Sequence, residues 1–316
     1  MKKFAENRAV LGCLLAGLML FALCGCGTQG EQADSGKTAS VPGLLQFYGD
    51  NMVVYNTDGL QIGADEDYDE VTILTDRQNN QTGVMFLKIQ FSSAADTSTT
   101  VNEGPVPESS VFSFYTPQGE LVRRVELPGD AQPAIYNGSL TDCYFQLTNE
   151  QERSYTIFDT HGQELITKVI SAPEDMNLNY LYLYYTGKLL LVNYEVADSD
   201  WTKWDNYLEA FMPDGTPAPL GHREDGVFRE YLSVIPIYDS VSHGDSQYYQ
   251  AEYEISPGNK LYDVITADGT AVIGNLRRLH TYGQGVLACE QGNYRGLMDM
   301  QGKWICKESI FDNLSD

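Results

Sequence analysis

The sequence has little positive charge. It contains 20 Lys and Arg residues against 44 Asp and Glu residues, for a formal net charge of −24. A nucleic-acid-binding protein needs cations to neutralise phosphates, so this balance excludes a nucleic-acid partner. It also argues against docking on anionic lipid through basic patches.

The sequence also lacks the common catalytic and metal-binding motifs. Its 4 histidines lie far apart, and none has a metal-ligand spacing such as H-E-x-x-H. There is no G-x-S-x-G nucleophile elbow and no phosphate-binding loop. Carboxylates are so frequent that a pair at glycosidase spacing would arise by chance. We therefore expect no catalytic residues and a protein that is not an enzyme.

Only one long apolar run is present, and it lies at the N-terminus. Residues 9–23 are apolar over 15 positions, short of the roughly 20 that a spanning helix needs. Lys2, Lys3 and Arg8 precede this run. A basic start followed by an apolar run of this length is typical of a signal peptide.

The run ends in Leu23, Cys24, Gly25 and Cys26. These four residues resemble the lipobox of bacterial lipoproteins, in which Leu and two small residues precede Cys. The resemblance implies cleavage before Cys26 and a diacylglyceryl group on its sulfur. Residues 1–25 would then be a lipoprotein signal peptide, and the small, polar residues 26–42 a flexible tether. The expected location is the outer, extracytoplasmic face of the cell membrane, where a lipid anchors the protein without spanning.

A four-residue turn that ends in Gly recurs along the chain, each time after a β-rich run. A Gly at the fourth position takes the positive φ of a type I turn with a following bulge. Asp, Asn or Thr at the first position can accept hydrogen bonds from the turn's own backbone. The copies span residues 56–59, 116–119, 159–162, 212–215, 266–269 and 299–302.

The turns divide the chain into similar blocks of strands. Blocks of about four strands are expected at residues 69–127, 133–170, 177–221, 222–273 and 275–310. Residues 43–63 supply about three strands, and the last segment, ESIFDNL, supplies one more that could complete them. We therefore predict an all-β fold for residues 43–316, a six-bladed β-propeller-like ring of four-stranded antiparallel units. An open curved array of the same units is the alternative.

Residues 282–314 begin with an aromatic-x-x-Gly motif at Tyr282 and Gly285, contain a Gly-Lys turn at residues 302–303 and end in an aromatic-Asp pair at residues 311–312. This pattern resembles the WG-repeat family of bacterial surface and secreted proteins. Arg295 stands where that family has its Trp, and residues 261–274 resemble a weaker copy. The resemblance implies β-repeat architecture and a binding role, because the family shares no common catalytic activity. The matching positions are Tyr282, Gly285, Leu287, Ala288, Gly296, Asp299, Gly302, Lys303, Phe311 and Asp312.

Two tryptophans form the first candidate site. Trp201 and Trp204 stand three apart in a stretch that is expected to be a loop, with Asp205 beside them. Flat aromatic faces with neighbouring carboxylates and amides suit sugar rings, and exposed aromatics also form protein-interface hot spots. The alternative is that both indoles pack onto the sheet.

An acidic loop is the second candidate site. Asp65, Asp67 and Asp69 alternate with Glu66 and then precede Glu70. Dense oxygen ligands could hold Ca²⁺, which prefers 6–8 oxygens. A solvated charged loop is the favoured alternative, and no other cofactor is expected.

Three cysteines remain after Cys26: Cys143, Cys289 and Cys306. In a meander, the strand at residues 294–299 separates Cys289 from Cys306 by about 9–10 Å. That separation exceeds the limit of about 7 Å between Cα atoms of a disulfide. We expect three buried thiols and no disulfide.

These features together predict a non-enzymatic, lipid-anchored binding or interaction scaffold. Its partner would be an envelope protein or a glycan, and Cys26 would attach it to the membrane. The alternative is a substrate-binding lipoprotein that captures carbohydrate or peptide with Trp201 and Trp204. A cell-wall hydrolase is the less favoured third reading.

Overall fold

The computed structural model describes residues 41–47, 52–91, 106–170, 173, 175–237, 247–281 and 285–310. The chain divides into two compact regions, residues 1–40 and 41–316. The predicted signal peptide, Cys26 and most of the tether lie outside the described residues, as do Tyr282, Phe311 and Asp312. Within the described part, no helix is long and apolar enough to cross a membrane.

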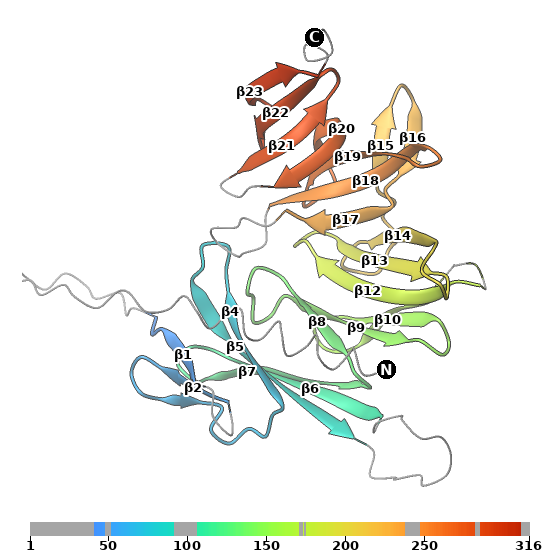
Figure 1. The fold of residues 1–316 in the computed structure, drawn as a ribbon. Coiled ribbons are helices and arrows are strands. Elements are labelled where there is room, and N and C mark those ends of the chain that lie inside the picture. The colour runs from blue at the N-terminus through green and yellow to red at the C-terminus, as the bar shows by residue number, and fades with distance from the viewer. Residues whose placement is uncertain are drawn as a thin grey trace, which may run out of the picture. The chain divides into compact units, whose positions relative to one another are not determined.

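The described residues form antiparallel strands joined by turns, which confirms the all-β prediction (Figure 1). The first two sheets contain β1 (Leu44–Phe47), β2 (Val53–Asn56) and β3 (Gln61–Ile62), and then β4 (Glu70–Thr75), β5 (Gln81–Phe91), β6 (Pro107–Tyr115) and β7 (Leu121–Pro128). The next two contain β8 (Gln132–Ile135), β9 (Cys143–Asn149), β10 (Ser154–Phe158) and β11 (Glu164–Val169), and then β12 (Asn177–Tyr185), β13 (Leu190–Ala197) and β14 (Trp204–Phe211).

A short hairpin and a seven-stranded sheet complete the fold. The hairpin consists of β15 (Gly221–Glu224) and β16 (Val227–Glu230). The large sheet contains β17 (Ser233–Pro236), β18 (Tyr248–Ser256), β19 (Asn259–Thr266), β20 (Ala271–Thr281), β21 (Val286–Gln291), β22 (Tyr294–Asp299) and β23 (Trp304–Ser309).

The long strand β20 belongs to two blocks of strands at once. Its first half pairs with β19, where Ile273 lies opposite Val264, and its second half pairs with β21, where Leu279 lies opposite Cys289. Asn275 adopts a positive φ of 60° between the halves, next to irregular register on both sides. The seven-stranded sheet thus contains two repeats that share β20, and the boundary predicted between residues 273 and 275 falls within this strand.

The described residues therefore form six consecutive repeats: β1–β3, β4–β7, β8–β11, β12–β14, β17–β20 and β20–β23. One hydrophobic core lies between each consecutive pair of repeats, which makes five cores. All five cores lie within residues 41–316, so we expect this region to fold without residues 1–40. Residues that share a core across two repeats are, in chain order, Val54 with Phe86, Phe112 with Phe145, Ile157 with Val192, Leu191 with Ala251, and Val264 with Leu287.

Each described sheet is open, with two edge strands. The fourth repeat has three strands and an isolated bridge between Phe211 and Pro217, so its predicted fourth strand is wrong. In the described residues β1 pairs with β2 alone, and the predicted closing strand continues past residue 310, outside them. The six-bladed ring therefore stays a prediction.

All six predicted turns are confirmed. In each, the N–H of the fourth-position Gly donates to the carbonyl of the first residue over 2.9–3.1 Å. The φ angles of these glycines lie between 79° and 86°. Asn56, Asp159 and Asp299 at first positions accept two backbone N–H groups each through Oδ1, as the turn chemistry predicts.

The turn glycines also have a packing role that the sequence did not reveal. In five of the six turns, an added Cβ would contact a side chain of the preceding repeat, so each turn packs on the repeat before it. Gly59, in the first turn, faces open space. The contacts are Gly119 with Leu60 at 2.8 Å, Gly162 with Val125 at 2.7 Å, Gly215 with Leu165 at 3.2 Å, Gly269 with Leu220 at 2.5 Å and Gly302 with Ile273 at 3.4 Å.

This double role predicts a large effect for Gly162→Ala. Gly162 has a φ of +79°, and its added Cβ would also lie 2.7 Å from Val125. We expect a loss of about 2–3 kcal/mol, combining about 1 kcal/mol for the left-handed backbone with the cost of overpacking. The matched control is Gly258→Ala, where φ is +76° and no atom lies within 4 Å. Equal losses in urea denaturation would show that the turn does not pack on the preceding repeat.

The cysteine predictions are confirmed in part. Cys143, Cys289 and Cys306 form no disulfide in the described region. β22 lies between β21 and β23, so the predicted meander separates Cys289 from Cys306. Cys306 is exposed, so the prediction of three buried thiols is wrong for this residue. The reason is that β23 is an edge strand whose four central residues, 305–308, are all exposed.

Burial should therefore separate the thiols by reactivity. It raises the pKa of Cys143 to about 12 and that of Cys289 to about 11, which suppresses their thiolates at neutral pH. We expect iodoacetamide at pH 8 to modify one thiol rapidly in residues 41–316 and the other two only on unfolding. Peptide mass spectrometry should place the rapid label on Cys306, and Cys306→Ser should remove it.

Candidate functional site

The candidate site lies at the hairpin that joins β13 to β14. Asp198 closes the loop, because its N–H donates to the carbonyl of Lys203 over 3.1 Å. Its carboxylate accepts the N–H and hydroxyl of Thr202 at 2.7 and 2.6 Å. These bonds lower the pKa of Asp198, with the Thr202 hydroxyl as the largest cause. The loop is therefore held by its own side chains.

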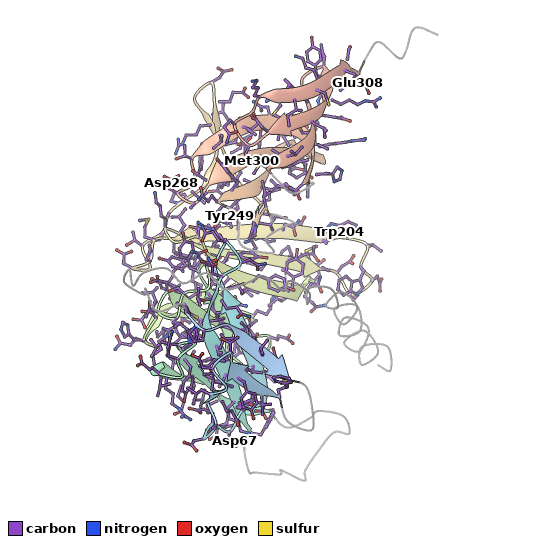
Figure 2. The ribbon with its side chains drawn as sticks, turned by 90° about the vertical axis from the view of Figure 1, so that its left-hand side faces the viewer. Asp67, Trp204, Tyr249, Asp268, Met300 and Glu308 are labelled. Carbon is purple, nitrogen blue, oxygen red and sulfur yellow. The ribbon has the colours of Figure 1, made fainter. Side chains whose placement is uncertain are left out.

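Both indoles of this hairpin are exposed to solvent. Trp201 is 60% exposed and Trp204 is 58% exposed, so the alternative that they pack onto the sheet is wrong. Trp201 adopts a positive φ of 58°, an uncommon conformation for a bulky residue. Trp204 is the first residue of β14, so the loop between β13 and β14 is shorter than the sequence predicted (Figure 2). An ordered hairpin thus presents two flat apolar surfaces.

Asp205 does not share the surface of Trp204. Adjacent residues of a strand point to opposite faces of the sheet, and Asp205 follows Trp204 within β14. Asp205 lies opposite Val196, whereas Trp204 lies opposite Ala197. The prediction that these two side chains form one ligand site is therefore wrong, because strand alternation separates them.

Four residues share the face of Trp204, and three of them, Tyr180, Tyr182 and Glu195, were missed by the sequence analysis. Register places Tyr180 opposite Glu195, and Glu195 opposite Asn206, one step inward from Trp204 on the same face. The Tyr180 hydroxyl donates to Glu195 over 3.4 Å, and its ring lies 5.2 Å from that of Tyr182. The period-2 run of tyrosines in β12 could have predicted that Tyr180 and Tyr182 share a face, but the sequence does not pair them with Glu195.

The polar groups on this face are positioned by one another. Asn179 Nδ2 donates to Glu195 Oε1 over 2.6 Å, so that carboxylate accepts from two neighbours. Burial raises the pKa of Tyr180, and Glu195 raises it further, so the phenol stays protonated and can donate. Tyr182 is 53% exposed beside them. Exposed rings next to fixed hydrogen-bonding groups suit a ligand with both apolar and hydroxylated surfaces.

Only the outer end of this face is available. Farther along the same strands, Leu191 and Ala210 enter the core shared with β17–β20. Asn193 Oδ1 accepts the N–H of Val234 over 2.8 Å in the same region. The next repeat therefore covers the inner part of the face. The aromatic platform comprises five residues of this face and the exposed Trp201 of the adjoining loop: Trp204, Tyr180, Tyr182, Glu195, Asn206 and Trp201.

The acidic loop uses several of its carboxylates within the protein. Lys88 Nζ lies 3.2 Å from Asp67 and 3.4 Å from Asp69, and Glu66 lies 3.3 Å from Arg124. Among the described residues, no group of three or more His, Cys, Asp or Glu side chains could hold a metal ion. The calcium hypothesis for Asp65, Asp67 and Asp69 stays a prediction, and a calcium titration of the melting temperature would test it.

The structure also assembles a buried polar cluster that the sequence analysis missed. His222 Nδ1 lies 2.8 Å from Asp263 Oδ2, and the Tyr231 hydroxyl donates to the same oxygen over 2.8 Å. The N–H of Asn275 donates to Asp263 Oδ1, and the His222 ring stacks on Tyr253 at 4.3 Å. Asp263 is 0% exposed and His222 is 6% exposed. Because His222 and Asp263 are 41 positions apart in the sequence, no local motif could have predicted the pair.

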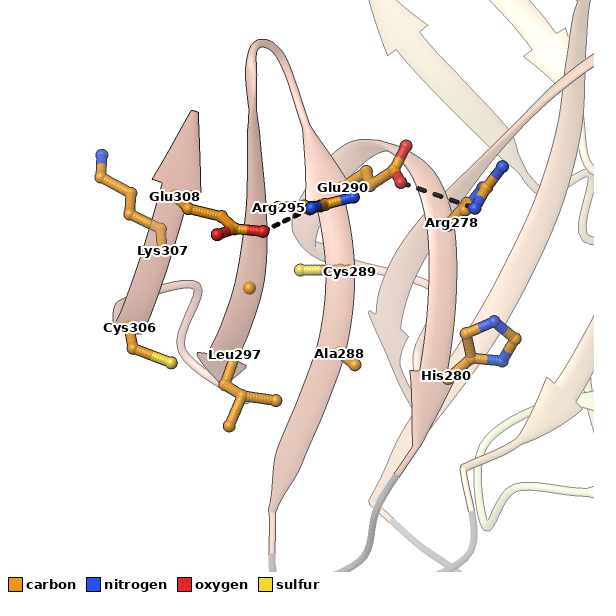
Figure 3. Close-up of a pocket in the computed structure, with 11 residues that line it drawn as sticks. Arg278, His280, Ala288, Cys289, Glu290, Arg295, Leu297, Cys306, Lys307 and Glu308 are labelled. Carbon is orange, nitrogen blue, oxygen red and sulfur yellow. Dashed lines mark hydrogen bonds and ion pairs between the residues drawn. The ribbon is translucent and has the colours of Figure 1, made fainter. Parts of the chain in front are cut away.

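A hollow of about 570 Å³ lies on the face of the last repeat (Figure 3). Ala288, Leu297 and Cys306 form its apolar part. Two ion pairs lie beside it, Arg278 with Glu290 at 3.7 Å and Arg295 with Glu308 at 2.6 Å. Four charged side chains of the hollow thus have ion-pair partners within the sheet.

No protein-family model matches the chain, and no curated protein is significantly similar to it. The resemblances to the lipobox and to the WG-repeat family therefore stay predictions.

Proposed function

We propose that this protein is an exported, lipid-anchored binding protein that recognises carbohydrate with the aromatic platform. The observation that carries the proposal is the pair of exposed indoles on an ordered hairpin. Sugar rings present apolar C–H faces that can lie on Trp201 and Trp204. Their hydroxyls can bond to Glu195 and Asn206, whose positions are already fixed by neighbouring side chains.

The proposed location rests on the N-terminal sequence. Lipidation of Cys26 would hold the chain on the extracytoplasmic face of the membrane, with residues 26–42 as a tether. Membrane fractionation tests this part separately. The parent chain should enter the membrane pellet, and Cys26→Ser should release it to the aqueous fraction.

We propose that the protein has no catalytic role. The His222–Asp263 pair supports this, because both side chains are buried within the fold. A buried His whose partner Asp also accepts from a Tyr hydroxyl and a backbone N–H has the chemistry of a structural cluster. Release of free sugars from a glycan by residues 41–316 would contradict the proposal and favour the hydrolase.

The six-bladed ring is retained as a proposal about the finer architecture. Closure would join the outer face of β1–β3 to the outer face of β20–β23 within one molecule. The alternative is an open array of the same repeats, in which these two faces are available to other molecules.

A glycan and peptidoglycan-fragment array on residues 41–316 tests the proposed function. Binding that Trp201→Ala/Trp204→Ala removes would support carbohydrate recognition at the platform. Binding that survives this change would place the site elsewhere. With no glycan bound, the proposal fails, and an envelope-protein partner identified by crosslinking on intact cells becomes the better reading.

A further inference from the structure

We propose that, in the open array, copies of this protein associate end to end. The outer face of β20–β23 of one copy would receive the outer face of β1–β3 and the Asn56–Gly59 turn of the next. This inference is independent of the proposed carbohydrate recognition, because it uses the first and last repeats and not the aromatic platform.

One contact between neighbouring repeats recurs along the described part of the chain. In five of the six turns, the Gly packs on a side chain of the preceding repeat. Gly119 lies against Ile62 and Gly215 against Leu165, and both of these residues come three positions after their own turn's Gly. In the other three turns the receiving residue comes four to six positions after the Gly of the preceding repeat, so the three-residue offset holds for two of the five contacts.

In the last repeat, no turn Gly from a following repeat packs on the corresponding residue within the described region. Ile305 comes three positions after Gly302, as Ile62 comes three after Gly59. Ile62 is 1% exposed under the next repeat, whereas Ile305 is 58% exposed. Cys306, next in the chain, is exposed and lines the hollow of about 570 Å³ on this face (Figure 3).

In the first repeat, the turn Gly has no preceding repeat to pack on within the described region. Gly59 has no atom within 4 Å of an added Cβ, unlike the other five turn glycines. Leu45 is 51% exposed and Phe47 is 52% exposed on the face of β1–β3 that points away from the shared core. Tyr55 lies opposite Leu45, and its ring is 5.9 Å from that of Phe47. This face is apolar, as the inner faces of the other repeats are.

Charge favours contact between unlike ends. Residues 271–310 contain five Lys and Arg residues against three Asp and Glu residues, a formal charge of +2 in a chain of −24. Residues 43–62 contain two Asp residues and no Lys or Arg, a formal charge of −2. Complementary potentials promote the head-to-tail encounter and disfavour contact between two identical ends.

A contact between unlike faces does not close as a twofold dimer. Each copy keeps one free face of each kind, so rows or closed rings of copies result. A lipid anchor on every copy would confine them to one plane and increase their encounters. The partner that these faces fit best is therefore a second copy of this chain.

Blocking one end at a time tests the proposal. Phe47→Glu places a charge on the first end and Ile305→Glu places one on the last, both at exposed positions in residues 41–316. In sedimentation equilibrium, the parent protein should form species larger than dimers as concentration rises. Each variant alone should have the monomer mass. An equimolar mixture of the two variants should reach twice the monomer mass and no more, because one intact contact remains.

Two results would overturn the inference. One is a monomeric parent protein and a monomeric mixture at all concentrations tested. If both variants also melt at lower temperature in that case, the two faces meet within one molecule, and the ring is correct. The other is a parent protein whose oligomers persist in both variants, which would place the contact elsewhere. Val169→Glu, at a 68% exposed position in β11, is the control and should associate like the parent.

Discussion

Replacing Trp201 and Trp204 together with alanine is expected to weaken glycan binding by about 100-fold or more. Aromatic hot spots contribute at least about 2 kcal/mol each, and their effects are not fully additive, so a combined loss of about 3 kcal/mol is reasonable. Each 1.4 kcal/mol corresponds to a tenfold change in Kd. Isothermal titration calorimetry with the best glycan from the array measures this change.

The same variant should keep its stability. Both indoles are mostly exposed, and substitutions at such positions usually change the free energy of unfolding by less than about 0.5 kcal/mol. Phe91→Ala is the matched control, because Phe91 is a 49% exposed aromatic residue on β5. An affinity loss of equal size in Phe91→Ala would show that the platform is not the recognition surface.

Changing Glu195 to Gln should show how much of the glycan affinity comes from hydrogen bonding and how much from stacking on the rings. The amide keeps the shape of the side chain but loses the charge that strengthens hydrogen bonds to sugar hydroxyls. We expect a smaller loss of affinity than the double tryptophan variant shows. This comparison belongs to the same titration series.

Replacing Asp263 with alanine is expected to destabilise the fold by about 3–5 kcal/mol. The change removes the shared acceptor of His222, Tyr231 and the Asn275 N–H, all of which lie in buried surroundings. Removing their shared acceptor leaves three polar groups unpaired at a cost of about 1–3 kcal/mol each, which gives losses of this size. Urea denaturation followed by circular dichroism measures the loss.

The loss of stability in Asp263→Ala should be confined to the repeats near the substitution as well as large. In a repeat protein, each repeat contacts only its neighbours, so damage spreads over a short distance. We expect faster amide hydrogen exchange in β19 and β20 and little change in β4–β7. The control is Asp205→Asn, because Asp205 is exposed. A loss below about 1 kcal/mol in Asp263→Ala would show that the cluster does not support the fold.

Much of the repeat organisation could be predicted because its signals are local. A Gly after a short polar turn records a backbone conformation, and that requirement acts within four residues. All six turns were therefore identified correctly, from residues 56–59 to residues 299–302. The limits of the second and third repeats were also close, at residues 70–128 and 132–169 against the expected 69–127 and 133–170.

The errors concern features that depend on which strands become neighbours. Trp204 and Asp205 are adjacent in sequence, yet strand alternation directs them to opposite faces. Cys306 was expected to be buried, but β23 is an edge strand, and Cys306 is exposed. At Asn275 a positive φ lets β20 take part in two repeats, and the only sign of this in the sequence is one short polar residue.

The sequence by itself therefore determined the all-β class and the six turns, because backbone propensity and turn chemistry act over a few residues. The tertiary structure decided the rest. It placed the turn glycines on the preceding repeats, brought His222 to Asp263 and set Glu195 beside Tyr180. These contacts join residues that are distant in sequence or on different strands, and only the register of the strands and the packing of the sheets bring them together.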